Sequence, residues 1–243
     1  MNTDNNERKN LDEITNTCLA AYSGDIIGTR MCIIQEEFKQ GFDFMKRYPK
    51  SVTIFGSARL SPETQTAKNI TELAEKIAIA GYAVVTGGGH GVMGAANKGA
   101  NLGGGDSLGI NIELPFEQTT NDYLTDSISF HHFFSRKVAL SYSAEAYIYA
   151  PGGFGTMDEM FEILTLKQTG KIPPVPIILF GSEFWKPLEN YFKEIMLIPG
   201  QETISLEDLD LYVITDDTDE VMNIITSAPI REEVSVTHHL EDK

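Results

Sequence analysis

The chain has 243 residues, a hydrophobic fraction of 42% and a formal net charge of −16 at pH 7. This length suggests one domain with an appendage, or two small domains. A chain this negative repels polyanions, and it has no stripe of Lys and Arg interleaved with aromatic residues, so we expect no nucleic-acid partner. No run approaches about 20 uninterrupted apolar residues, and the polar N-terminus lacks the apolar core of a signal peptide. We therefore expect a cytoplasmic protein with no membrane partner.

The two cysteines, Cys18 and Cys32, both lie in the N-terminal region. A reducing cytosol keeps such residues as thiols, and two cysteines without a nearby histidine pair make a poor zinc site. We expect both to be small buried hydrophobes, and we expect no bound metal.

The chain divides into three parts by its pattern. Residues 1–48 show helical spacing and no recognisable chemistry, which predicts an N-terminal helical extension; residues 49–226 form the main domain, and residues 227–243 a polar tail. Within the main domain short apolar runs alternate with helical stretches. The expected strands lie in residues 51–59, 82–89, 108–114, 146–150, 175–180 and the first part of 210–225. The first expected helix begins at Ser61 and Pro62, which suit the cap and first positions of a helix. The other expected helices lie in residues 91–100, 131–143, 157–170, 184–196 and the last part of 210–225.

Strands that are apolar on both faces and alternate with helices predict a parallel sheet covered by helices, a doubly wound α/β fold. Small residues in the helix at 91–100 predict that it packs very close to the sheet. In such folds ligands bind outside the carboxyl ends of the strands, where the strand order reverses. Three of the expected strands end in glycine turns, which is where such a site would form.

Two of these turns carry several glycines each. Glycine lets backbone N–H groups approach a ligand closely, and the N-terminus of the following helix carries a partial positive charge that favours an anion such as phosphate. A structural role in tight turns is the alternative. The spacing matches neither the dinucleotide fingerprint nor a P-loop. The glycines are Gly87, Gly88, Gly89 and Gly91 in the first turn, and Gly152, Gly153 and Gly155 in the second.

The second glycine turn is followed by two carboxylates on one helical face, Glu159 and Glu162. The spacing from Thr156 to Glu159 predicts a capping box, in which the glutamate bonds back to the helix start. Carboxylates beside a phosphate cradle repel the same anion, so they would suit ribose hydroxyls or a positively charged transition state.

The segment before the 146–150 strand carries two adjacent cations, Arg136 and Lys137. They form either a solvated face or a nucleotide contact, since Arg hydrogen-bonds anions bidentately and stays charged. His131 and His132 are neighbours that point to different sides of a helix, so a structural role is expected for them.

Three motifs together resemble the LOG (Lonely Guy) family, the cytokinin riboside 5′-monophosphate phosphoribohydrolases, long mislabelled lysine decarboxylases. They are "GGGHGVMGAANKGA" (87–100), "SRK" (135–137) and "PGGFGTMDEMFE" (151–162). The resemblance spans roughly residues 51–226 in motif order. It implies a Rossmann-like fold, a homodimer or higher homo-oligomer, and hydrolysis of the N-glycosidic bond of a nucleoside 5′-monophosphate without metal or redox cofactor.

By this resemblance Arg136 and Glu159 are the catalytic pair. Two features depart from the family's pattern: His90 stands where many plant-type members have a small residue, and the N-terminal extension is longer than in compact members. The remaining site positions would bind substrate, and they are Ser57, Gly88, Gly89, Met93, Lys137, Gly152, Gly153, Gly155, Thr156 and Glu162.

The chemistry agrees with these residue types. Cleavage of the C1′–N bond builds oxocarbenium-like charge on the ribose, which a fixed carboxylate at Glu159 stabilises while it orients the water. Arg136 would keep Glu159 ionised. Two alternatives stay open: a non-catalytic carrier of a nucleotide or of molybdenum cofactor, and a pyridoxal-phosphate decarboxylase, for which no lysine in the glycine motifs is a clear candidate.

Overall fold

The computed structural model describes residue 18 and residues 24–114, 119–142 and 144–229 of the chain. Its centre is a seven-stranded sheet in the order β4-β3-β2-β1-β5-β6-β7, and every neighbouring pair of strands is parallel. The strands are β1 (Ser51–Phe55), β2 (Ala83–Thr86), β3 (Ser107–Ile112), β4 (Asp126–Phe130), β5 (Ala146–Tyr149), β6 (Ile177–Phe180) and β7 (Val213–Thr215).

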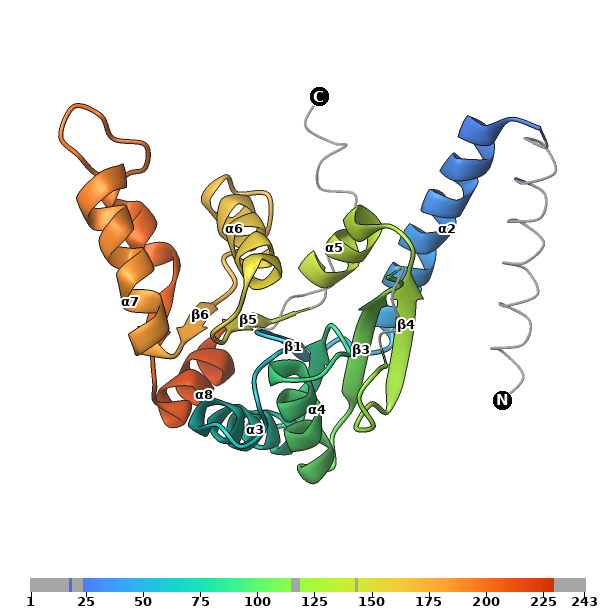
Figure 1. The fold of residues 1–243 in the computed structure, drawn as a ribbon, viewed down its shortest axis with the longest axis horizontal. Helices are drawn as coiled ribbons and strands as arrows, with labels where there is room; N and C mark the ends of the chain where they lie inside the picture. Colours follow the sequence, from blue (N-terminus) through green and yellow to red (C-terminus); the bar gives the residue numbers. More distant parts are fainter. Residues whose placement is uncertain (1–17, 19–23, 115–118, 143, 230–243) are drawn as a thin grey trace.

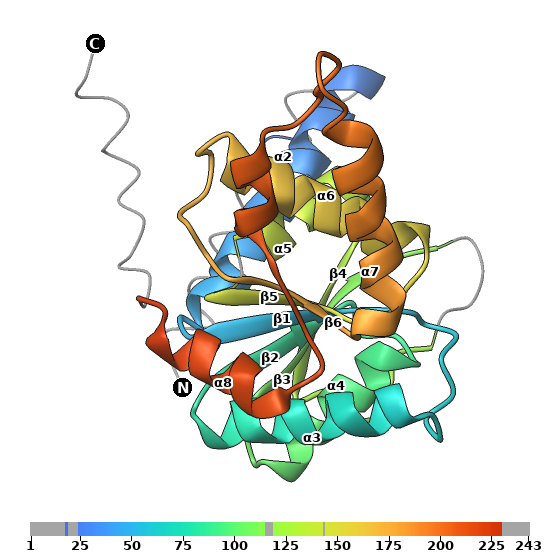
Figure 2. The ribbon, with the colours of Figure 1, turned by 90° about the vertical axis from the view of Figure 1, so that its left-hand side faces the viewer.

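Helices cover both faces of this sheet (Figures 1 and 2). One buried cluster joins the sheet to α3, α4 and α8, and a second joins its other face to α2, α5, α6 and α7. The predicted doubly wound, Rossmann-like fold is thereby confirmed. The helices are α2 (Ile26–Lys46), α3 (Gln65–Ile79), α4 (Val92–Leu102), α5 (Phe133–Ser141), α6 (Phe154–Gln168), α7 (Ser182–Tyr191) and α8 (Thr218–Ser227), with a π-helical turn (Phe192–Met196) after α7 and a 3₁₀ helix (Leu206–Leu211) before β7.

The strand order reverses between β1 and β5. From β1 the chain adds strands outward to β4 on one side, and from β5 it adds strands outward to β7 on the other. The crevice outside the carboxyl ends of strands at such a reversal is the usual ligand site of this fold. All residues of β1, β2, β5 and β6 are buried, which explains why these strands read as continuous apolar runs.

Two elements differ from the sequence-based expectation. Strand β4 was not predicted, because it is an edge strand whose residues alternate between partly buried and exposed up to Phe130. Helix α3 begins later than expected: Ser61 and Pro62 lie in a turn, and the side chain of Thr64 caps α3 by accepting a hydrogen bond from the Ala67 amide.

The N-terminal helix α2 packs against the sheet domain. Phe44 and Met45 belong to the buried cluster on this face. A Cβ placed on Gly41 would lie 3.0 Å from the Cβ of Ala139 in α5 and 3.0 Å from the ring of Phe130, so the two helices approach closely at this point. The helical character expected for this part of the chain is confirmed for Ile26–Lys46, whereas the domain boundaries stay predictions.

The structure corrects the expectation of free thiols. Cys18 and Cys32 form a disulfide, and their Cα atoms lie 6.0 Å apart, within the range that a disulfide spans. Cys32 is buried, as expected. Among the residues that the structure describes, no helix combines the length and the apolar character needed to cross a bilayer. The cytoplasmic location stays a prediction.

Helix α4 packs against the sheet through buried residues such as Ala96 and Asn97, and it approaches α3 very closely at Gly99. A Cβ on Gly99 would lie 2.1 Å from the carbonyl oxygen of Thr71 and 2.8 Å from the Cβ of Ala74. We expect Gly99→Ala to lower the free energy of unfolding by about 2 kcal/mol, because backbone atoms of α3 must move. Urea denaturation measures this. Lys98→Ala, on the exposed side of the same helix, is the control, and an unchanged midpoint in Gly99→Ala would contradict the prediction.

Candidate active site

The turns after β1, β2 and β5 meet at Ser57. The Ser57 amide donates to the carbonyl oxygen of Pro151, which follows β5, at 3.0 Å. The Ser57 carbonyl accepts from the amide of Val92, the first residue of α4, at 2.9 Å. Its hydroxyl accepts from the Arg59 amide within its own turn. The structure thus brings the three predicted glycine turns together at the strand reversal.

The first glycine turn, between β2 and α4, is held by polar side chains. Gly88 and Gly91 have φ values of 73° and 64°, which favour glycine. The Gly88 amide donates to the hydroxyl of Thr86 at 2.9 Å. The side-chain amide of Asn121 donates to the carbonyl oxygens of Gly88 and Gly89, at 3.2 and 2.9 Å. Sequence reasoning missed Asn121, which lies 33 positions after Gly88 and carries no local signal.

Arg136 lies against this first turn. A Cβ on Gly87 would lie 2.5 Å from a terminal nitrogen (Nη2) of Arg136 and 2.9 Å from the sulfur of Met93, so any other residue here would displace one or both of these side chains. The Nε atom of Arg136 donates to the carbonyl oxygen of Ile110 in β3 at 2.8 Å. The guanidinium is therefore fixed between the end of β3 and the first glycine turn.

The second glycine turn leads into α6, whose N-cap residue is Gly153 and has no side-chain cap. A Cβ on Gly152 would lie 2.1 Å from the hydroxyl of the buried Thr156, so glycine is required there. A Cβ on Gly153 or Gly155 would meet nothing within 4 Å, so this backbone faces open space. An uncapped and accessible helix N-terminus is suited to bind an anion.

The predicted capping box between Thr156 and Glu159 is wrong. Helix α6 begins at Phe154, so Thr156 is already its third residue and cannot be the N-cap. Glycine at the cap position lets the helix start earlier than the spacing of polar residues indicates. The side chain of Glu159 is thus not engaged at the helix start.

Glu159 is the most perturbed carboxyl group of the site. Its side chain is buried, with 7% of the residue exposed. Burial raises its pKa to about 7, against the opposing influence of Arg136 and Lys137; the negative charges of Glu162 and Asp158 raise it further. Burial also lowers the pKa of Arg136, and the charge of Glu159 opposes this effect. A carboxyl group that titrates near neutrality can exchange protons at working pH, which is typical of catalytic acids and bases.

Lys137 joins the two helices that flank β5. From α5 its ammonium group contacts Asp158 at 2.7 Å and Glu162 at 3.1 Å, both on α6. These hydrogen bonds raise the pKa of Lys137, although burial, the largest single influence, acts in the opposite direction. The structure therefore pairs two predicted site positions, Lys137 and Glu162, with each other. Asp158, which was not predicted, completes this contact.

The described part of the chain contains no group of three or more His, Cys, Asp or Glu side chains arranged to hold a metal ion. His131 and His132 instead contact Glu37 of α2. His90, in the first glycine turn, has its Nε2 atom 2.9 Å from the hydroxyl of Thr119.

The parallel sheet, its strand reversal and the convergent glycine turns define a Rossmann-like α/β protein. Residues 93–225, more than half of the chain, match the family model described as "Possible lysine decarboxylase". The protein belongs to this family, which is the LOG family that the sequence motifs resemble.

Two bacterial relatives with similar sequences share one enzyme name. A cytokinin riboside 5′-monophosphate phosphoribohydrolase of Rhodococcoides fascians is 30% identical over 148 residues, which are 60% of this chain and 75% of the relative. One of the same name from Mycobacterium marinum is 25% identical over 148 residues, covering 60% of this chain and 78% of the relative.

Solved structures support the fold. The molybdenum cofactor carrier protein of Chlamydomonas reinhardtii superposes with a TM-score of 0.55 at 22% identity, covering 73% of this chain and 96% of that one. The molybdenum cofactor binding protein of Rippkaea orientalis gives a TM-score of 0.53 at 21% identity, with coverages of 73% and 94%. At these identities the likeness concerns the fold alone.

We expect Glu159→Gln to stabilise the protein at pH 8 and to leave its stability nearly unchanged at pH 4. The folded-state pKa of about 7 lies above the ordinary 4.5, so the wild type loses stability as the pH rises from 4.5 through 7. The loss is at most about 3 kcal/mol, and an uncharged glutamine does not suffer it. Urea unfolding at both pH values measures the difference. Glu63→Gln removes an exposed carboxylate and serves as control; equal gains in both variants would count against the prediction.

Proposed function

We propose that this protein hydrolyses the N-glycosidic bond of a nucleoside 5′-monophosphate, AMP or a cytokinin riboside monophosphate, to the free base and ribose 5-phosphate. The observation that carries the proposal is the buried carboxyl group of Glu159, which has a pKa near 7. Glu159 is the sixth residue of a helix whose uncapped N-terminus is open to an anion. The names of the curated relatives support the same reaction.

The phosphate would bind at the second glycine turn. The backbone amides at the start of α6 supply N–H donors, and the helix adds partial positive charge. Gly153 and Gly155 present backbone without side chains, while Gly152 accommodates the hydroxyl of Thr156. The first glycine turn, with Gly88, Gly89 and Met93, and the nearby Ser57 would line the rest of the nucleotide.

Glu159 would act on the ribose. As the C1′–N bond breaks, its electron pair passes to the base nitrogen and positive charge develops on C1′. Ionised Glu159 stabilises this charge and takes a proton from the water whose oxygen bonds to C1′. The proton taken by Glu159 then passes to the departing base nitrogen, so the net change is the addition of water across the bond. Arg136 supplies the positive charge that favours ionised Glu159, and Lys137 with Glu162 keeps α5 and α6 in register.

Wild-type protein should release base and ribose 5-phosphate in equal amounts from AMP or N6-prenyl-AMP, measured by chromatography beside GMP and CMP. Glu159→Gln should lower kcat about a hundredfold, because it removes a charge that acts in the transition state. Glu63→Gln is the control. A folded wild type that leaves all four nucleotides intact would refute the enzyme. If such a protein still binds nucleotide, and Glu159→Gln binds it equally well, a non-catalytic carrier is the better assignment.

We further propose that the protein assembles as a homodimer or higher homo-oligomer. An aromatic face on α2 and α5 supports this: the rings of Phe42 and Tyr142 lie 5.0 Å apart, those of Phe38 and Phe134 6.4 Å apart. Phe42, Phe134 and Tyr142 are 39%, 45% and 48% exposed.

Light scattering should give at least twice the chain mass of 26.9 kDa. Tyr142→Glu should reduce the assembled fraction, because it places a charge in an apolar interface. A monomeric wild type at micromolar concentration would contradict the prediction.

A further inference from the structure

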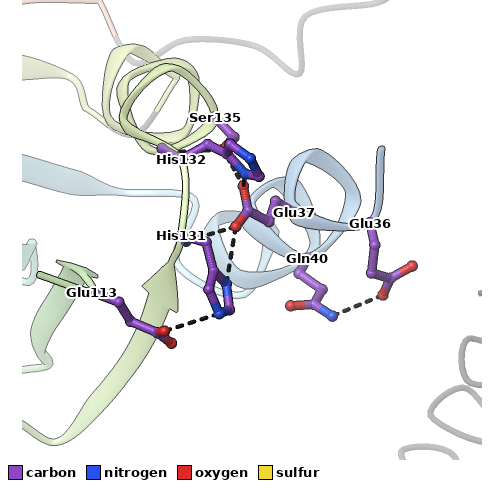
Figure 3. A network of polar contacts seen from close by, with 7 residues as sticks. All are labelled: Glu36, Glu37, Gln40, Glu113, His131, His132 and Ser135. Carbon is purple, nitrogen blue, oxygen red and sulfur yellow. Dashed lines mark hydrogen bonds and ion pairs between the residues drawn. The ribbon is translucent and has the colours of Figure 1, made fainter. Parts of the chain in front are cut away.

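Glu37 is a buried carboxylate in the middle of α2, outside the segment that the family model matches. It reaches from α2 to the N-terminal end of α5 (Figure 3). One carboxylate oxygen accepts a hydrogen bond from the backbone amide of His131 at 2.6 Å. The other lies 3.0 Å from Nδ1 of His132 and accepts a hydrogen bond from the hydroxyl of Ser135.

Glu37 lies beside a helix start that has no local side-chain cap. His132 is the N-cap residue of α5, and its side chain makes no cap hydrogen bond to the helix. The carboxylate of Glu37 instead places a negative charge at the positive end of the α5 dipole. Burial raises the pKa of Glu37, but the hydrogen bonds from Ser135, the His131 amide and His132 together outweigh burial and hold it below its ordinary value. Glu37 is therefore ionised at neutral pH.

The same network reaches the end of β3. The exposed ring of His131 lies between two carboxylates, with Nδ1 3.3 Å from Glu37 and Nε2 2.9 Å from Glu113, the residue after β3. The Glu113 amide donates to the carbonyl oxygen of Phe130, the last residue of β4. Glu37 thus joins α2, the β4–α5 connection and the end of β3 (Figure 3).

Arg136 follows Ser135 directly, in the first turn of α5. Its guanidinium is anchored at one point, the hydrogen bond from Nε to the carbonyl oxygen of Ile110. The backbone of Arg136 has a second anchor, because its amide donates a hydrogen bond to the carbonyl oxygen of His132. Glu37 in turn holds this turn through the side chains of His132 and Ser135. Loss of the second anchor would let the first turn of α5 move relative to Glu159.

We propose that Glu37 is a positioning residue that aligns Arg136 with Glu159 by fixing the first turn of α5. The expected effect on kcat rests on the proposed function. The alignment of Arg136 by Glu37 does not depend on which reaction Glu159 catalyses. It gives the N-terminal helix a role in the site: α2 contributes the anchor of the helix that carries Arg136 and Lys137.

The first test measures the pKa of Glu159 by ¹³C NMR of its carboxyl carbon in wild type, Glu37→Gln and Glu36→Gln. Arg136 and Lys137 lower this pKa, whereas Glu162 and Asp158 raise it. Displacement of Arg136 in Glu37→Gln should raise it by about half a unit or more. Removing the negative charge of Glu37 without movement would lower it, so the sign separates the two effects. An unchanged or lowered pKa would overturn the proposal.

Glu36→Gln is the matched control. It makes the same charge change at the neighbouring residue of α2, where Glu36 accepts a hydrogen bond from Gln40 on its own helix. We expect this variant to leave the pKa of Glu159 and the kinetics unchanged. An equal effect of both variants would show that charge alone acts, and would overturn the proposal.

The second test is kinetic, with AMP or the nucleotide that the wild type cleaves fastest. Misalignment of Arg136 should lower kcat about ten- to a hundredfold, while KM changes less than about threefold, because the phosphate site on α6 is untouched. Glu37→Asp, which keeps the charge, should recover part of kcat. A loss confined to KM would overturn the proposal.

Ser135→Ala guards against an unfolded Glu37→Gln variant, since it removes one partner of the same carboxylate and leaves Glu37 in place. Like Glu37→Gln, this variant should raise the pKa of Glu159 and lower kcat, and it should still unfold cooperatively. If the wild type cleaves no nucleotide, the proposed function fails, and the NMR titration alone then decides whether Glu37 aligns Arg136. A folded Ser135→Ala variant with wild-type titration and kinetics would overturn the role assigned to Glu37.

Discussion

The rest of the site depends on the burial of the Glu159 carboxyl group. An isolated carboxylate is costly to bury, so the protein must either keep it protonated or supply positive charge beside it. Arg136 and Lys137 supply that charge but do not cancel the effect of burial, and the pKa settles near 7. Such a group can stabilise positive charge when ionised and can also accept a proton. Each cation must in turn be fixed: Lys137 by two carboxylates of α6, and Arg136 by the Ile110 carbonyl.

The topology explains why these groups meet. Helix α5 leads into β5 and α6 leads out of it, and both helices pack into the same buried cluster on one face of the sheet. Strand β5 lies next to β1, where the strand order reverses, so the turn after β5 faces the turn after β2 across the carboxyl edge. Ser57, hydrogen-bonded to both neighbouring turns, keeps this edge together. The site therefore draws on both halves of the sheet, and neither half contains it alone.

The sequence pattern predicted those features of the fold that neighbouring residues determine. Fully buried strands read as apolar runs, and glycine at strand ends indicated the turns that converge. Contacts made across long stretches of chain left no such signal: Asn121, which hydrogen-bonds to the first glycine turn, and Glu37 of α2, which hydrogen-bonds to the start of α5, are ordinary polar residues in the sequence. Strand β4 was missed because an edge strand with one exposed face lacks a continuous apolar run. The capping box failed since Gly153 starts the helix without a polar side chain, and the disulfide contradicted an expectation that rested on compartment alone.

The strong negative charge of the chain and a site for an anion are compatible because they act over different distances. Over more than about 8 Å, exposed charges are screened by salt, so the net charge of −16 governs the encounter with large polyanions and not contacts within the crevice. Inside the crevice Lys137 is already neutralised by Asp158 and Glu162. The remaining positive potential comes from Arg136 and from the uncapped amides of α6, which are fixed and short-ranged. The proposed mononucleotide would need only these groups, whereas a nucleic-acid strand would extend beyond them and meet the net negative charge of the chain, so the expectation of no nucleic-acid partner does not conflict with the proposed phosphate site.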